Sequence, residues 1–89
     1  MRVLTYCPFM EDVHAELVRA DSLHKPMNSL HEAYAVLLEE VDELWDEVRK
    51  KSSERSKAAI REELVQIAAM AWRTAKNLGL TERFIEPKD

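Results

Sequence analysis

The chain is poor in the residues that punctuate turns and strands, since it holds one glycine and three prolines. Runs of β-branched residues are also few, whereas Glu, Lys, Leu and Ala, which favour helices, are abundant. A sheet-rich fold needs both turn residues and β-branched runs. The composition therefore argues against a sheet and predicts an all-α protein.

Cysteine is nearly absent as well. With Cys7 alone, no disulfide can form within the chain, which favours a reducing cytosolic setting. No apolar run approaches the ~20 residues that a membrane-spanning helix needs. The first residues turn acidic too early for a secretory signal peptide. We therefore expect a cytoplasmic protein with no membrane partner.

Positive charge is in the minority, with 13 Lys and Arg against 17 Asp and Glu and a net charge of −4. No basic stripe is available to neutralise phosphates, so nucleic acid is not expected as a partner. A small anionic ligand remains compatible with this charge if a divalent cation bridges it to the carboxylates of the chain.

The length of 89 residues indicates one small domain, 1–89. A chain of this size buries only about 60–65% of its unfolded surface. Yet 46% of its residues are hydrophobic, more than three short helices easily hide. Association of several copies is the natural solution. We therefore predict a homo-oligomer, a dimer or a tetramer, assembled as a four-helix-type bundle.

Periodic apolar residues predict a short first helix and a longer second one. The first is expected to begin at Pro8, whose ring suits the first helical position, and to fade near 21–23. The second is expected to start after Ser29, which forms a capping box with Glu32. It is expected to run to about Lys51.

A third helix follows a turn at 52–56, with Ser53 or Ser56 as its N-cap. Gly79 is well placed to end it in a Schellman-type stop. Because so few residues join the second and third helices, we expect an antiparallel hairpin preceded by the shorter helix.

The apolar rows of this hairpin are expected to face each other. On the second helix that row is Leu30, Tyr34, Leu37, Val41, Leu44 and Val48. A second row is expected beside the core on each helix, and both carry carboxyl or carboxamide groups. These rows are Ala33, Val36, Glu40, Glu43 and Glu47 on the second helix, and Ala59, Glu63, Gln66 and Met70 on the third. Helical bundles build metal sites in this way.

The segment 39–47 places six carboxylates in nine residues, with no Lys or Arg among them. Six like-charge pairs at helical spacing cost about 1–3 kcal/mol in total. A fold that keeps such a row usually has a cation beside it, either a metal ion or a basic partner. The alternative is a solvated helix face that pairs with Lys57, Arg61 or the basic end 49–51.

Two motifs carry a resemblance to a known family. Residues 39–43 read E-E-x-x-E, and residues 63–66 stand where a following helix should carry E-x-x-D. Over 29–80, the chain resembles the MazG-like, all-α nucleoside triphosphate pyrophosphohydrolases, especially the short, phage-type, single-domain members.

The resemblance implies an enzyme that uses Mg²⁺ or Mn²⁺ to cleave a nucleoside triphosphate into the monophosphate and pyrophosphate, with nucleotide-pool house-cleaning as a role. It also implies a homo-oligomer. The implied metal ligands are Glu40, Glu43, Glu63 and Gln66. Glu39 is implied to act in catalysis, by contacting a second metal or by receiving a proton from the attacking water.

Gln66 departs from the family pattern, which has Asp at this position. An amide oxygen can ligate Mg²⁺ but brings no charge. Three consequences are possible. The metal affinity of the site is lower, a nearby acid replaces the missing Asp carboxylate as a ligand, or catalysis has been lost. The alternative function is therefore a non-catalytic helical dimer that binds a metal, a nucleotide or a protein.

Five basic or polar residues are candidates for substrate contact. His24, Lys25 and Asn28 lie in the loop before the acidic helix, where they can meet a phosphate or a base. Arg61 and Arg73 can meet phosphate oxygens. The alternative for all five is an ordinary solvated surface.

Three aromatic or imidazole side chains invite other interpretations. Glu11-x-x-His14 has the form used by di-iron bundles, but a single clean copy disfavours that chemistry. Trp45 and Trp72 lie at helical core spacing, so we expect both to pack in the core or at an interface.

Overall fold

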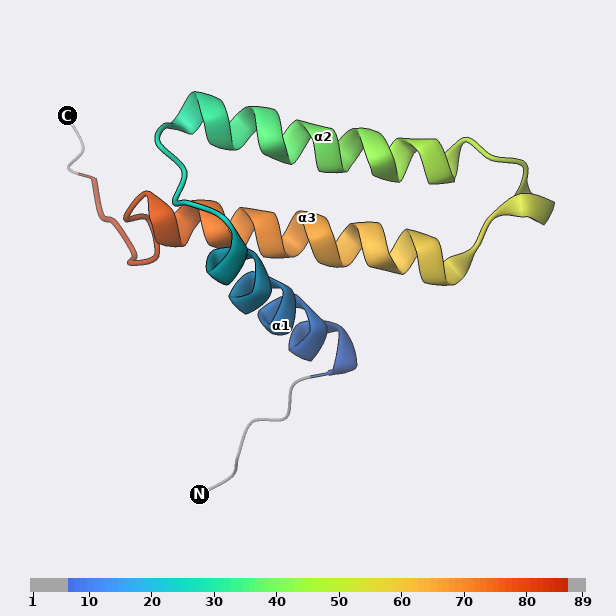
Figure 1. Cartoon of the computed structure of the whole chain (residues 1–89), viewed down its shortest axis with the longest axis horizontal. Coiled ribbons are helices and arrows are strands. Elements are labelled where there is room, and N and C mark those ends of the chain that lie inside the picture. Colours follow the sequence, from blue (N-terminus) through green and yellow to red (C-terminus); the bar gives the residue numbers. More distant parts are fainter. Residues whose placement is uncertain (1–6, 87–89) are drawn as a thin grey trace, which may run out of the picture.

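A computed structural model describes residues 7–86 and arranges them as three α-helices and one short 3₁₀ turn (Figure 1). The elements are α1 (Pro8–Leu23), α2 (Leu30–Val48), η1 (Ser52–Glu54) and α3 (Lys57–Asn77). No strand occurs within this part of the chain, and no helix in it is both long and apolar enough to span a bilayer. The prediction of an all-α fold is confirmed.

The start of α2 follows the expected chemistry with one difference. Ser29 Oγ accepts the backbone N–H of Glu32 at 3.1 Å, as a capping residue should. The Glu32 carboxylate, however, accepts the backbone N–H of Asn28 at 2.6 Å, one residue before the cap.

The end of α2 differs from the expected position. The helix stops at Val48 and not near Lys51. The Arg55 Nε–H donates to the carbonyl oxygen of Val48 at 2.9 Å, which satisfies one of the last helical acceptors and draws the chain into the turn.

Both ends of α3 agree with the sequence. Ser56 is the N-cap, since its Oγ accepts the backbone N–H of Ala59 at 3.1 Å. Gly79 has a φ of 73°, a backbone conformation that glycine adopts without steric cost. Leu80 N–H then donates to the Ala75 carbonyl at 2.7 Å, the long bond of a Schellman motif.

The helix α3 is the centre of the fold, because α1 and α2 each pack on it and not on each other (Figure 1). The helices α2 and α3 run side by side as the predicted antiparallel hairpin. Apart from Leu17 and Ala20 of α1, the buried apolar side chains form two small clusters. Their buried members are Val13, Val65 and Ala69 between α1 and α3, and Met27, Ala33 and Met70 between α2, its preceding loop and α3.

The prediction that the apolar row of α2 faces α3 is wrong for three of its members. Tyr34 is 67% exposed, and Leu30 and Val41 are exposed as well. The two rows share the face towards α3. Ala33 of the second row is buried, Val36 and Glu40 are half-buried, and so are Leu37, Leu44 and Val48 of the apolar row. Small Ala33 lies at the contact with α3, and the helix is rotated so that only Leu30, Tyr34 and Val41 of the apolar row are exposed.

The two serines in the turn provide a test of the observed cap. Ser56→Ala should lower the free energy of unfolding by about 1 kcal/mol, because it leaves a backbone N–H of α3 without its acceptor. Ser53→Ala, inside η1, should change it by less than ~0.5 kcal/mol. Urea denaturation at one fixed protein concentration measures both. Equal losses would contradict the cap assignment.

Candidate metal centre

Three carboxylates converge where α2 packs on α3. One carboxylate oxygen from each of Glu40, Glu43 and Glu63 lies within 4.8 Å of the other two. Glu40 and Glu43 are three residues apart, so they share one face of α2. The antiparallel register of the hairpin then sets Glu63 of α3 against them. The structure thus brings together three of the four acids at the defining positions of the two motifs, and Glu39 is not part of this group.

One oxygen of the Glu63 carboxylate is enclosed by the protein. Its Oε1 is buried and has no hydrogen-bond partner among the described residues. A buried acceptor without a partner costs about 1–3 kcal/mol. Glu40 is half-buried and Glu43 is exposed, so the group opens towards solvent on one side.

The electrostatics of the site favour uptake of positive charge. Partial burial, followed by the charge of Glu43 and a hydrogen bond with it, raises the pKa of Glu40 to about 7; Glu63 and Glu39 add to the effect. Burial and then Glu43 also raise the pKa of Glu63. A proton or a metal cation at this point relieves the repulsion.

The alternative of a salt-bridged acidic face holds only for the end of the row. Asp46 pairs with Arg49 at 3.3 Å, and Glu47 pairs with Lys50 at 3.1 Å. Within residues 7–86, no Lys or Arg forms an ion pair with Glu40, Glu43 or Glu63. The three converging carboxylates therefore lack the basic partner that a solvated face would use.

Gln66, the fourth implied ligand, has other partners. Its Nε2 donates to Glu62 Oε2 at 3.2 Å. It also lies near Glu16 of α1, whose pKa is lowered mainly by its hydrogen bond with Arg19 and to a smaller degree by Gln66. The amide is thus bonded to an acid outside the group formed by Glu40, Glu43 and Glu63. Metal ligation by Gln66 stays a prediction, as does the catalytic role of Glu39, which is exposed next to Glu40.

A cavity of about 450 Å³ adjoins the carboxylates, and Glu40 forms part of its wall. Four of the five candidate substrate residues line it too: His24, Lys25, Asn28 and Arg73. Buried Met27 and Met70 give it an apolar side. The loop before α2 and the acidic helix therefore enclose one space.

Arg61 lies elsewhere, in the contact between α1 and α3. Its Nη1 donates to Asp12 Oδ2 at 2.8 Å, and its guanidinium lies 5.6 Å from the centre of the Phe9 ring. The structure thus separates Arg61 from the cavity that holds the other candidates.

The burial of Arg73 is the feature that sequence reasoning missed. Its side chain is 5% exposed; Nε donates to Asp21 Oδ1 at 3.0 Å and Nη2 donates to the Lys25 carbonyl at 2.7 Å. The spacing along α3 indicates this burial, because Arg73 follows buried Ala69 by four residues and buried Met70 by three. It therefore continues the buried face of α3.

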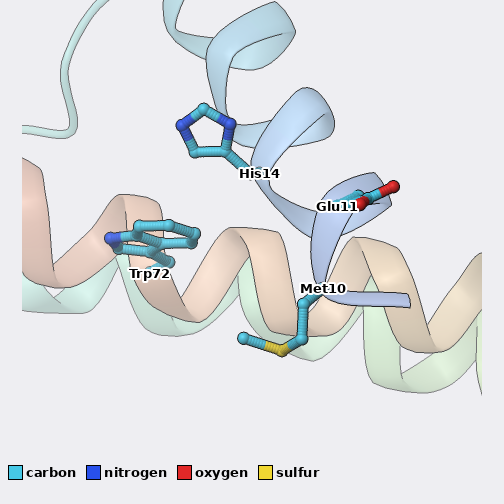
Figure 2. Close-up of a pocket in the computed structure, with 4 residues that line it drawn as sticks. All are labelled: Met10, Glu11, His14 and Trp72. Carbon is cyan, nitrogen blue, oxygen red and sulfur yellow. The ribbon is translucent and has the colours of Figure 1, made fainter. Parts of the chain in front are cut away.

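A second, smaller cavity of about 250 Å³ lies between α1 and α3, lined by Met10, Glu11, His14 and Trp72 (Figure 2). The rings of His14 and Trp72 are 5.6 Å apart and tilted by 44°, while Glu11 points away from them. No third carboxylate, histidine or cysteine joins Glu11 and His14 in the described chain. This arrangement lacks the ligand set of a di-iron centre.

No protein-family model, curated protein or solved structure matches the chain. The resemblance to MazG-like enzymes therefore stays a prediction that rests on the two motifs.

The raised pKa of Glu40 has a consequence for stability. The folded chain holds this proton up to about pH 7, whereas the ordinary pKa is 4.5. The stabilising contribution is therefore complete below about pH 4.5 and is lost as the pH rises through about 7. In metal-free buffer, Glu40→Gln should match wild type near pH 4.5 and be the more stable at pH 8.

Urea denaturation with a chelator, at several pH values, measures this difference. Asp42→Asn is the matched control, because it removes one negative charge from an exposed position of the same helix. A Glu40→Gln advantage that does not grow with pH would contradict the assigned environment of Glu40.

Proposed function

We propose that this chain is a divalent-metal-dependent nucleoside triphosphate pyrophosphohydrolase, with Glu40, Glu43 and Glu63 as the metal-binding group. The observation that carries the proposal is the convergence of three carboxylates that have no basic partner and that include a buried, unpartnered oxygen. Hard oxygen donors suit Mg²⁺ and Mn²⁺.

The adjoining cavity supports a nucleotide as the ligand. Its volume of about 450 Å³ falls in the usual range of small-molecule pockets. Lys25 and His24 supply donors for phosphate oxygens, and the apolar side next to Met27 and Met70 suits a base. Asn28 can bond a base edge through either end of its amide.

To cleave a triphosphate, the protein mainly has to position the substrate and neutralise the charge of its phosphates. A bound divalent ion would neutralise phosphate charge and lower the pKa of a water molecule. The chain's own residues would hold the triphosphate against the carboxylates, and Glu39 would take the proton of the attacking water. Attack at the α-phosphorus releases pyrophosphate.

The exposed apolar side chains of α2 support an oligomer as the working form. Leu30, Tyr34 and Leu37 line a shallow groove together with Ala71 of α3, and Trp45 is 59% exposed further along α2. Tyr34 and Glu43 are nine residues apart, about two and a half turns, so they lie on opposite sides of α2. A second copy can cover the row and leave the carboxylates accessible.

Such a contact pairs identical hairpins, which gives a four-helix bundle with two-fold symmetry. We refer to Leu30, Tyr34, Leu38, Val41 and Trp45 as the outer row; all are exposed in the single chain.

One observation favours the non-catalytic alternative. The Gln66 amide donates to Glu62, and the group that could hold a metal consists of three carboxylates without a fourth ligand among the described residues. Metal or nucleotide binding without turnover is the outcome that would select a binding protein over an enzyme.

The decisive experiment is a panel of standard and modified nucleoside triphosphates, assayed for pyrophosphate release with Mg²⁺, Mn²⁺ and Co²⁺. We expect metal-dependent release for at least one substrate. Glu40→Gln and Glu63→Gln should reduce it by about 100-fold or more, because each removes a charged ligand. Asp42→Asn should retain it. Silence of the wild type across the panel, with binding seen by calorimetry, would select the alternative.

The oligomer is tested separately by light scattering at micromolar concentration. We expect the wild type to be a dimer or tetramer, and Tyr34→Glu to be a monomer because it buries a charge in the outer row. Val18→Glu is the control, since Val18 is an equally exposed apolar residue on α1, away from that row. A monomeric wild type would contradict the proposal.

A further inference from the structure

The loop between α1 and α2 is fastened to α3 at two backbone positions. The Arg73 Nη2–H donates to the Lys25 carbonyl at 2.7 Å, and the Asn77 side-chain oxygen accepts the Met27 N–H at 2.9 Å. The Met27 side chain is buried against α3 between the two. The loop path is thus set by α3 through main-chain bonds that do not depend on the polar side chains of the loop.

Arg73 links this loop to the end of α1 as well. Its Nε donates to Asp21 Oδ1 at 3.0 Å, while Lys76 binds the other oxygen of the same carboxylate at 2.6 Å. The two cations differ in burial, because the Arg73 side chain is 5% exposed and that of Lys76 is 56% exposed. Only Arg73 reaches the loop.

The fastened loop forms part of the wall of the cavity that Glu40 also lines. His24, Lys25 and Asn28 of the loop and Arg73 of α3 line this cavity together with Glu40. A displacement of the loop would therefore change the space between these side chains and Glu40. Glu40, Glu43 and Glu63 lie on α2 and α3 and not on the loop, so we expect such a displacement to move them less than the loop side chains.

We propose that Arg73 is a positioning residue: by bridging Asp21 and the Lys25 carbonyl, it sets the loop 24–28 at the distance from Glu40 that a bound nucleoside triphosphate requires. The inference rests on the proposed function and deepens it. Arg73 acts on nucleotide affinity and not on metal affinity. Its fork of donors is essential, since one arm holds the carboxylate and another holds the carbonyl.

The test compares Arg73→Lys with Lys76→Met in the full chain. Lysine keeps the positive charge beside Asp21 but cannot hold the carboxylate and the carbonyl at once. We expect Arg73→Lys to raise the KM for the best triphosphate at least fivefold and to leave the Kd for Mn²⁺ within twofold of wild type. Lys76→Met, which removes the other partner of Asp21, should leave both values within twofold.

Hydrogen exchange of the Met27 amide reports the loop directly. We expect faster exchange in Arg73→Lys than in Lys76→Met. Asn77→Ala removes the acceptor of that amide and should reproduce the KM increase, so the proposal remains testable if Arg73→Lys does not fold.

The outcomes separate the two proposals. An active wild type whose KM is unchanged in Arg73→Lys and Asn77→Ala overturns the role of Arg73 and leaves the enzyme in place. A parallel rise in the Kd for Mn²⁺ overturns it too, because the effect is then general. A wild type that is silent across the panel overturns both proposals.

Discussion

The packing of α2 against α3 is the constraint on which the rest of the molecule depends. Small Ala33 and adaptable Met70 let the two helices approach, and their antiparallel register sets Glu63 against Glu40 and Glu43. The helices thereby hold together three groups that repel one another. Stability given up at one place in a small fold is typical of a functional site.

The same packing divides the hairpin into two unlike sides. One side carries the carboxylates and the cavity, which α3 completes by fastening the loop before α2. The other carries the outer row, which a single copy leaves in water. A chain of 89 residues has too little interior to cover both sides of its hairpin. Assembly and ligand binding can therefore use separate surfaces.

The helix α3 supplies residues to every part of the site. It supplies Glu63 to the carboxylates, Met70 to the apolar side of the cavity, and Arg73 and Asn77 to the loop. Since α1 packs on α3 alone, the Asp21–Arg73 bridge is also where α1 meets the cavity wall. Changes along α3 should therefore affect several parts of the site together.

The sequence by itself determined what local chemistry controls. Pro8, Ser29 and Gly79 each fix a helix end through their own backbone or side chain, and the spacing of Glu40, Glu43 and Glu63 already placed those acids on facing helices. Only the tertiary structure decided how each helix is rotated about its axis. That rotation exposed Tyr34 and buried Arg73, because periodicity defines a face of a helix but not which neighbour will cover it.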